Sequence, residues 1–182
     1  MTSPTITESN LIPGVLTAHL RAYADDRGQF AEVFRKGWFP HRTWDTFQMN
    51  HSVSQAGVLR GLHYHFHQVD YWYLVAGRIR VGLADLRRDS TAFMQTHAFD
   101  FDSANKQGLF IPTGVAHGFL ALTDVTLFYI VDNYYDGQDE HGLAWNDPDV
   151  SVEWHPQQKP ILSDRDVSNP LFSEIPSSSL PK

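Results

Sequence analysis

Hydrophobic and polar residues alternate in several short segments of this chain. Residues 77–87 place three apolar side chains on one face, namely Ile79, Val81 and Leu83. Residues 125–131 repeat the pattern with Val125, Leu127, Tyr129 and Val131. Because successive side chains of a strand point to opposite faces, both segments are predicted to be strands with one buried face.

Turn-forming residues separate these segments at short intervals, at 25–28, 76–77, 88–90, 112–114 and 136–137. The stretches between them are rich in Val, Ile, Phe, Tyr and Thr. Such spacing is typical of an antiparallel all-β sandwich or barrel. Helix signals are weak, and we expect only a short helix within residues 35–44 and a turn near residues 163–166.

The length of the chain predicts a single domain. Its 182 residues, 42% of them hydrophobic, can build one buried core but not two catalytic domains. We therefore interpret residues 1–182 as one domain, with an N-terminal strand region at 1–20. After Trp154 the composition shifts toward Pro, Gln and Ser, which indicates an extended segment along the barrel and a flexible tail at 173–182.

The charge and the absence of cysteine exclude several classes of function. A net charge of −7 argues against nucleic-acid or anionic-membrane binding, since both depend on clustered Lys and Arg. Without cysteine there is no disulfide or thiolate chemistry, so a metal would need His and carboxylate ligands. We see no apolar run long enough to span a membrane and no basic leader, and expect a cytoplasmic protein.

Histidines gather in two places, and this is where the chemistry is expected. His63, His65 and His67 alternate within one predicted strand and so share a face, while His117 follows a Pro-x-Gly turn. Taken alone, a His-x-His pair is as well explained by a polar outer face of a strand. Together, the two segments resemble the paired motifs of the cupin superfamily. The resemblance implies a double-stranded β-helix (jelly-roll) barrel with short peripheral helices.

A closer resemblance, from about residue 20 to 172, is to the dTDP-4-dehydrorhamnose 3,5-epimerase family. Seven ordered segments carry it: residues 26–32, 47–52, 58–63, 111–119, 133–135, 142–148 and 162–166. The resemblance implies an isomerase that epimerises a dTDP-linked 4-keto-6-deoxy sugar at C3, C5 or both, in deoxysugar biosynthesis. It also implies a homodimer that exchanges N-terminal strands, and no cofactor.

The family's functional residues carry over by position. His63 falls at the catalytic base, Asp166 at its partner and Tyr129 at the acid on the opposite face of the sugar. The positions that bind the nucleotide sugar are Arg27, Glu32, Gln48, Asn50, Arg60, His117, Glu140 and Arg165. Tyr135 falls where an aromatic ring stacks on thymine.

The chemistry of the reaction explains these residue types. Removing a proton beside a ketone gives an enolate, so the site needs a base with a pKa near neutrality, and His supplies one. A buried Asp on the other ring nitrogen would fix the tautomer of that base. Inversion then needs a proton donor on the opposite face, which suits Tyr129, although on pattern alone Tyr129 is better explained as a core aromatic.

Arginines are expected to bind the diphosphate, and one of them poses a geometric problem. Arg27, Arg60 and Arg165 can offer bidentate donors, although each could equally be a solvated surface residue. Strict alternation places Arg60 and His63 on opposite faces of the strand. A bulge at Gly61 would bring both inward, because glycine tolerates that conformation.

The chain departs from the family at Asp70, where the epimerases carry a lysine that stabilises the enolate oxygen. A charge pair at about 4 Å and an effective dielectric near 20 is worth roughly 4 kcal/mol, so a reversed charge has to be compensated or the reaction differs. In one interpretation a protonated His65 pairs with Asp70 and supplies the missing cation. Both residues would then belong to the substrate site.

Three other interpretations remain open from the sequence. One is a sugar 3,4-ketoisomerase, a related cupin family that lacks the segments at 133–135 and 162–166. Another is a metal-dependent cupin that uses His63, His65, Asp70 and His117 as ligands. The third is a binding protein without catalysis. We favour the epimerase without metal, because a ligated His63 could not act as a base.

Overall fold

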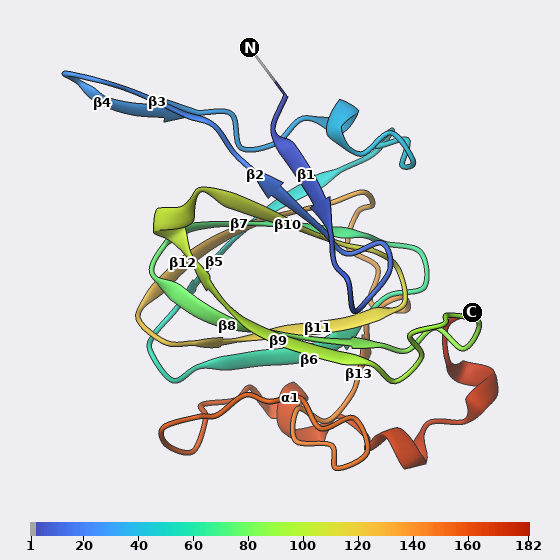
Figure 1. Cartoon of the computed structure of the whole chain (residues 1–182). Helices are drawn as coiled ribbons and strands as arrows, with labels where there is room; N and C mark the ends of the chain where they lie inside the picture. Colours follow the sequence, from blue (N-terminus) through green and yellow to red (C-terminus); the bar gives the residue numbers. More distant parts are fainter. Residues whose placement is uncertain (1–2) are drawn as a thin grey trace.

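Two antiparallel sheets face each other and form a barrel (Figure 1). The structure, a computed structural model, describes residues 3–182. In this range the larger sheet has the strand order β1-β2-β10-β7-β12-β5. Its strands are β1 (Thr5–Glu8), β2 (Leu16–His19), β10 (Gln107–Ile111), β7 (Asp70–Ala76), β12 (Val125–Val131) and β5 (Gln48–Ser54).

The second sheet has the order β13-β6-β11-β8-β9. Its strands are β13 (His141–Gly142), β6 (Leu59–Tyr64), β11 (Val115–Ala121), β8 (Arg78–Asp85) and β9 (Thr96–Asp102). A separate hairpin of β3 (Ala22–Asp25) and β4 (Gly28–Ala31) projects from the barrel (Figure 1). The antiparallel all-β barrel predicted from the sequence is confirmed.

Apolar side chains between the two sheets form the main core. The predicted inward faces of β8 and β12 meet there, with Ile79, Val81 and Leu83 fully buried and packed with Val125 and Leu127. Both alternation patterns therefore predicted the buried faces correctly. Tyr129 lies against the edge of this cluster and is only partly buried, so its strand extends from the core into the site.

Helices are short and peripheral, as expected, but not where the sequence pattern indicated. The segment 35–44 forms only the 3-10 turn η1 (Lys36–Trp38), whose neighbours Phe39 and Trp44 pack on the outer face of the larger sheet. The α-helix α1 (Asp164–Ser168) occupies the segment predicted as a turn. The remaining 3-10 turns are η2 (Ser103–Asn105), η3 (Phe172–Glu174) and η4 (Ser177–Ser179). No helix within residues 3–182 combines the length and apolar character needed to cross a membrane.

The C-terminal segment runs along the outer face of the smaller sheet, as predicted (Figure 1). Trp154 packs there with Leu59 and Leu120 in a second buried cluster. The flexibility of residues 173–182 stays a prediction, and the end of this segment packs against the barrel. Leu180 is only 4% exposed and the carbonyl of Pro181 accepts a hydrogen bond from the Arg88 amide at 2.9 Å, because the end of the chain covers apolar surface.

Candidate active site

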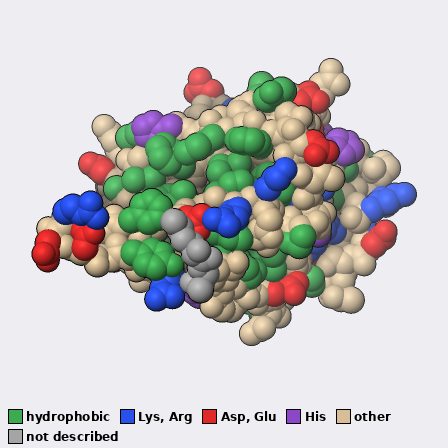
Figure 2. Space-filling model, turned by 90° about the horizontal axis from the view of Figure 1, so that it is seen from above, with side chains coloured by type: hydrophobic (Ala, Val, Ile, Leu, Met, Phe, Trp, Pro, Cys, Tyr) green, Lys and Arg blue, Asp and Glu red, His purple; other side chains and the backbone are tan. Residues whose placement is uncertain are grey.

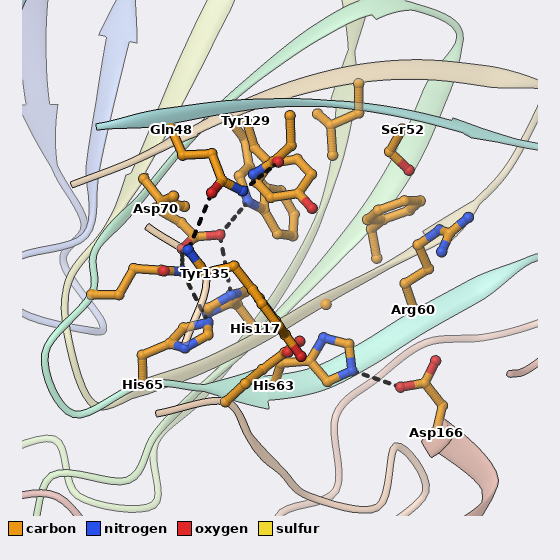
Figure 3. A pocket seen from close by; sticks show the side chains of 18 of the residues that line it. Gln48, Ser52, Arg60, His63, His65, Asp70, His117, Tyr129, Tyr135 and Asp166 are labelled. Carbon is orange, nitrogen blue, oxygen red and sulfur yellow. Dashed lines mark hydrogen bonds and ion pairs between the residues drawn. The ribbon is translucent and has the colours of Figure 1, made fainter. Parts of the chain in front are cut away.

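A cavity of about 370 Å³ opens between the two sheets (Figure 3). Strands from both sheets contribute to its walls, and α1 closes one side. The predicted residues that line it are Gln48, Asn50, Arg60, His63, His65, Asp70, His117, Tyr129, Tyr135, Glu140, Arg165 and Asp166. The fold therefore brings together residues that are up to about 120 positions apart in the sequence.

His63 and Asp166 form a hydrogen-bonded pair at one wall of the cavity. Nε2 of His63 lies 2.7 Å from Oδ1 of Asp166, whose side chain is 4% exposed. Asp166 is fixed in turn by Ser163, the N-cap of α1, which donates to Oδ2 at 2.8 Å and accepts from the Asp166 amide. Figure 3 shows the ring of His63 directed into the cavity, with Asp166 behind it.

The environment of Asp166 keeps its carboxylate ionised. Burial alone would raise the pKa of this carboxyl, but the hydrogen bond and charge of His63, together with Ser163, hold the pKa below its ordinary value. An ionised carboxylate only accepts hydrogen bonds, so Nε2 of His63 carries a hydrogen and donates it. Whenever Nδ1 is unprotonated, its lone pair is directed to the cavity.

A β-bulge brings Arg60 and His63 to the same cavity. In the pairing of β6 with β11, His63 lies opposite His117 and Arg60 opposite Phe119, so the register shifts between them. Gly61 adopts a φ of +118°, which favours glycine, and a Cβ atom there would lie 2.8 Å from the Gly118 Cα. The predicted bulge is confirmed.

Tyr129 lies on the opposite wall from His63, on β12 of the larger sheet (Figure 3). Burial raises the pKa of its phenol, the negative charges of Asp70 and Glu140 raise it further, and Arg60 opposes them. The phenol therefore keeps its proton at neutral pH. An imidazole and a protonated phenol thus face each other across the cavity.

Asp70 is buried in a polar network at the inner end of the cavity. Its carboxylate accepts from the Trp72 indole at 3.2 Å and from the Gln68 amide at 3.0 Å, and Oδ2 lies 3.5 Å from Nε2 of His117. Burial opposes ionisation of Asp70, yet the positive charge of the nearby His117 holds its pKa well below the ordinary value. For His117 burial lowers the pKa, but Asp70 raises it overall.

The structure corrects the expected ion pair between His65 and Asp70. The ion-pair partner of Asp70 is His117, and His65 instead donates from Nδ1 to the Asp139 carbonyl at 2.8 Å. Burial lowers the pKa of His65, which disfavours its protonated form. His117 on β11 brings Nε2 to 3.5 Å from Oδ2 of Asp70, whereas His65 lies in the loop after β6, where the Asp139 carbonyl holds its ring.

Arg60, Arg165 and Tyr135 differ in their contacts at the cavity. Arg60 and Arg165 line the cavity, where Arg60 donates to the Ser54 hydroxyl at 3.0 Å and Arg165 forms an ion pair with Glu140. Tyr135 is 70% exposed, and its amide donates to Gln48.

Two predicted substrate residues lie outside the cavity of the single chain. Arg27 is at the tip of the β3-β4 hairpin, where it pairs with Asp25 at 2.6 Å. Glu32 follows that hairpin and pairs with Arg35.

Sequence reasoning missed several residues of the site. These are Ser52, Gln68, Trp72, Phe119, Asp136 and Ser163 in the cavity wall, and Asp139 behind it. Ser163 carried a usable signal, since Ser-x-x-Asp at 163–166 is a helix N-terminus pattern. Asp139 carried none, because its contacts to the amides of residues 66–68 join segments more than 70 positions apart.

Comparison with known proteins identifies the family of the chain. A family model described as dTDP-4-dehydrorhamnose 3,5-epimerase matches residues 9–174. The dTDP-4-dehydrorhamnose 3,5-epimerase of Shigella flexneri is 37% identical over 168 residues, which cover 88% of this chain and 92% of the relative.

Solved structures match over nearly the whole chain. The rmlC epimerase of Mycobacterium tuberculosis has a TM-score of 0.91 and 34% identity, covering 98% of this chain and 94% of its own. An epimerase from Legionella pneumophila in complex with dTDP-4-keto-L-rhamnose has a TM-score of 0.90 and 31% identity, covering 98% and 97%. ChmJ, a 3'-monoepimerase from Streptomyces bikiniensis in complex with dTDP-quinovose, has a TM-score of 0.89 and 29% identity, covering 97% and 93%.

The barrel and these relatives together define a cupin-type isomerase, whose cavity has the imidazole of His63 on one wall and the phenol of Tyr129 on the other. Within that class, the chain belongs to the dTDP-4-dehydrorhamnose 3,5-epimerase family. It is an epimerase of dTDP-linked 4-keto-6-deoxy sugars in deoxysugar biosynthesis.

Proposed function

We propose that this enzyme epimerises a dTDP-linked 4-keto-6-deoxyhexose at C3, at C5 or at both, with His63 as the base. The observation that carries the proposal is the 2.7 Å hydrogen bond between His63 and the buried carboxylate of Asp166 at the cavity wall. Such a pair holds the imidazole in one orientation and stabilises the imidazolium that forms on proton abstraction.

In the first step, Nδ1 of His63 takes a proton from the carbon beside the C4 ketone. The electron pair of that C–H bond moves to the ketone oxygen and gives an enolate. General base catalysis of this kind contributes on the order of 10² to 10⁴ in rate. Asp166 keeps the ring in place and offsets the positive charge that it acquires.

In the second step, Tyr129 returns a proton to the same carbon from the opposite face. Its place across the cavity from His63, and the raised pKa that keeps its phenol protonated, both support this role. A donor on the opposite side from the base produces inversion instead of simple exchange.

The nucleotide is expected to bind toward the mouth of the cavity. A diphosphate carries about two negative charges, which Arg60 and Arg165 can meet with bidentate hydrogen bonds. Gln48, Asn50, His117 and Glu140 offer further polar groups to the nucleotide sugar. Tyr135 is exposed enough to stack on a thymine base.

We also infer a homodimer in which the hairpin of one subunit completes the site of the other. The hairpin projects from its own barrel and carries a group of charged side chains at its end (Figures 1 and 2). Its Phe30 is 56% exposed, and the edge strand β5 exposes Met49 and Val53. A partner would cover these apolar side chains and receive Arg27 and Glu32.

Incubation with dTDP-4-keto-6-deoxyglucose in D₂O tests the reaction itself. We expect NMR to show deuterium at C3, C5 or both, together with inversion at the labelled carbon. A 3-keto product would show a ketoisomerase instead. Binding of the nucleotide sugar without any exchange would contradict the proposal.

A further inference from the structure

His65, Asp70 and His117 form a compact group of potential metal ligands beside the catalytic pair. One ligand atom from each lies within 4.8 Å of the others. They come from the loop after β6, the start of β7 and the middle of β11, and their exposed fractions are 9%, 4% and 6%. Two imidazoles and a carboxylate suit divalent transition metals such as Zn²⁺, Co²⁺, Fe²⁺ and Ni²⁺.

Both histidines are held in the tautomer that metal binding requires. Nδ1 of His65 donates to the Asp139 carbonyl at 2.8 Å, and Nδ1 of His117 donates to the Val115 carbonyl at 2.9 Å. Each ring therefore directs Nε2 toward Asp70. A backbone carbonyl behind the far ring nitrogen is the usual support of a metal-ligating histidine.

The carboxylate of Asp70 is oriented in the same way. The Trp72 indole donates to Oδ2 at 3.2 Å and fixes the plane of the group. Nε2 of His117 lies 3.5 Å from Oδ2, which is long for a hydrogen bond. Two ligands at about 2.1 Å from one ion in a tetrahedral arrangement lie about 3.4 Å apart, so this separation fits a shared ion.

Gln68 marks the place where the ion would sit. Its amide nitrogen lies 3.3 Å from Nε2 of His65 and 3.0 Å from Oδ1 of Asp70, so it donates into the space between two acceptors. The side chain is on a loop and only partly buried, which lets it move aside. A cation would satisfy the same two acceptors and His117 together.

We propose that the enzyme binds one divalent transition-metal ion through Nε2 of His65, the Asp70 carboxylate and Nε2 of His117. His63 lies outside this group of ligand atoms and its ring is held by Asp166, so the base and the ion coexist. Three protein ligands leave coordination positions open, and all three residues line the cavity that holds His63 and Tyr129. The open positions therefore face the sugar site.

The ion also accounts for the charge reversal at Asp70. This part of the inference rests on the proposed epimerisation. With Asp70 paired only to His117, the enolate oxygen would meet an ion pair without net positive charge where the family carries a lysine. A divalent ion on the same carboxylate restores a positive charge next to the oxygen that receives the electron pair.

Metal binding is measured without substrate, so that its failure is separate from failure of the reaction. The purified full-length enzyme is stripped with a chelator and titrated with Zn²⁺ by calorimetry and with Co²⁺ by visible absorption. We expect one ion per chain, binding at least tenfold weaker in His65→Ala and in Asp70→Asn, and no change in His155→Ala, which removes an exposed histidine. Circular dichroism verifies that each variant is folded.

A wild-type protein that binds neither ion, or a folded His65→Ala variant that binds both as well as wild type, overturns the proposed metal site.

The role of the ion in the reaction is tested by deuterium exchange into dTDP-4-keto-6-deoxyglucose. We expect the stripped enzyme to exchange at least tenfold more slowly and to recover with Co²⁺ or Zn²⁺. Full exchange by the stripped enzyme overturns the role of the ion but leaves the proposed epimerisation intact.

Discussion

At the scale of single residues, Asp166 is the side chain that holds the ring of His63 in place. Its hydrogen bond holds the ring with Nδ1 toward the substrate and stabilises the protonated ring. We expect Asp166→Asn to lower kcat by on the order of 10²-fold, with KM for the nucleotide sugar changed much less. Steady-state kinetics on the folded variant measures both constants.

Asp164→Asn is the matched control, since Asp164 lies on the same helix but is exposed. Its kcat should stay within twofold of wild type. Equal losses in the two variants would mean that the helix, and not the contact with His63, is responsible.

The sequence predicted the members of the site better than their contacts. His63, Asp166 and Tyr129 were assigned by the family resemblance, and the fold places all three at one cavity. The predicted ion-pair partner of Asp70, His65, was wrong, because His65 and His117 are equally plausible partners in the sequence. Both rings lie close to the carboxylate, and only the folded structure shows that His117 is the one within ion-pair distance, at 3.5 Å.

At the scale of elements, the bulge in β6 sets the shape of the site. Gly61 has a φ of +118° and lies against the β11 backbone, so Gly61→Ala is strained in both conformation and space. We expect it to lower the free energy of unfolding by about 1–3 kcal/mol. Because Arg60 and His63 would lose their common face, epimerisation should fall at least tenfold in the fraction that remains folded.

Gly37→Ala provides the comparison, since a Cβ atom there has open space. Chemical denaturation and an activity assay on both variants make the test. If Gly61→Ala were as stable and as active as Gly37→Ala, the bulge would not be needed to position the two side chains.

Strands were more predictable than helices for a physical reason. Alternation identifies a half-buried strand directly, as β8 and β12 show. The conformation of segment 35–44 cannot be identified from a periodic pattern, because burial of Phe39 and Trp44 holds it in place without a regular helix. Helix α1 is too short for a periodic pattern and depends on the Ser163 cap.

At the scale of the whole molecule, the isolated barrel leaves Arg27 and Glu32 away from the cavity. We expect sedimentation to show a species of twice the 20.7 kDa chain mass. Arg27→Ala should raise KM for the nucleotide sugar about tenfold while the dimer persists, because a phosphate contact is lost. The exposed Arg88→Ala should leave KM unchanged. A fully active monomer would contradict this arrangement.

The account depends most on proton transfer at His63, and the position of deuterium in the sugar measures it directly. Incubated with dTDP-4-keto-6-deoxyglucose in D₂O, the wild type should label and invert the carbon beside the ketone, and His63→Ala should do neither. Tyr129→Phe should still label that carbon while losing inversion. Undiminished labelling by a folded His63→Ala enzyme would show that another group removes the proton and would contradict the mechanism.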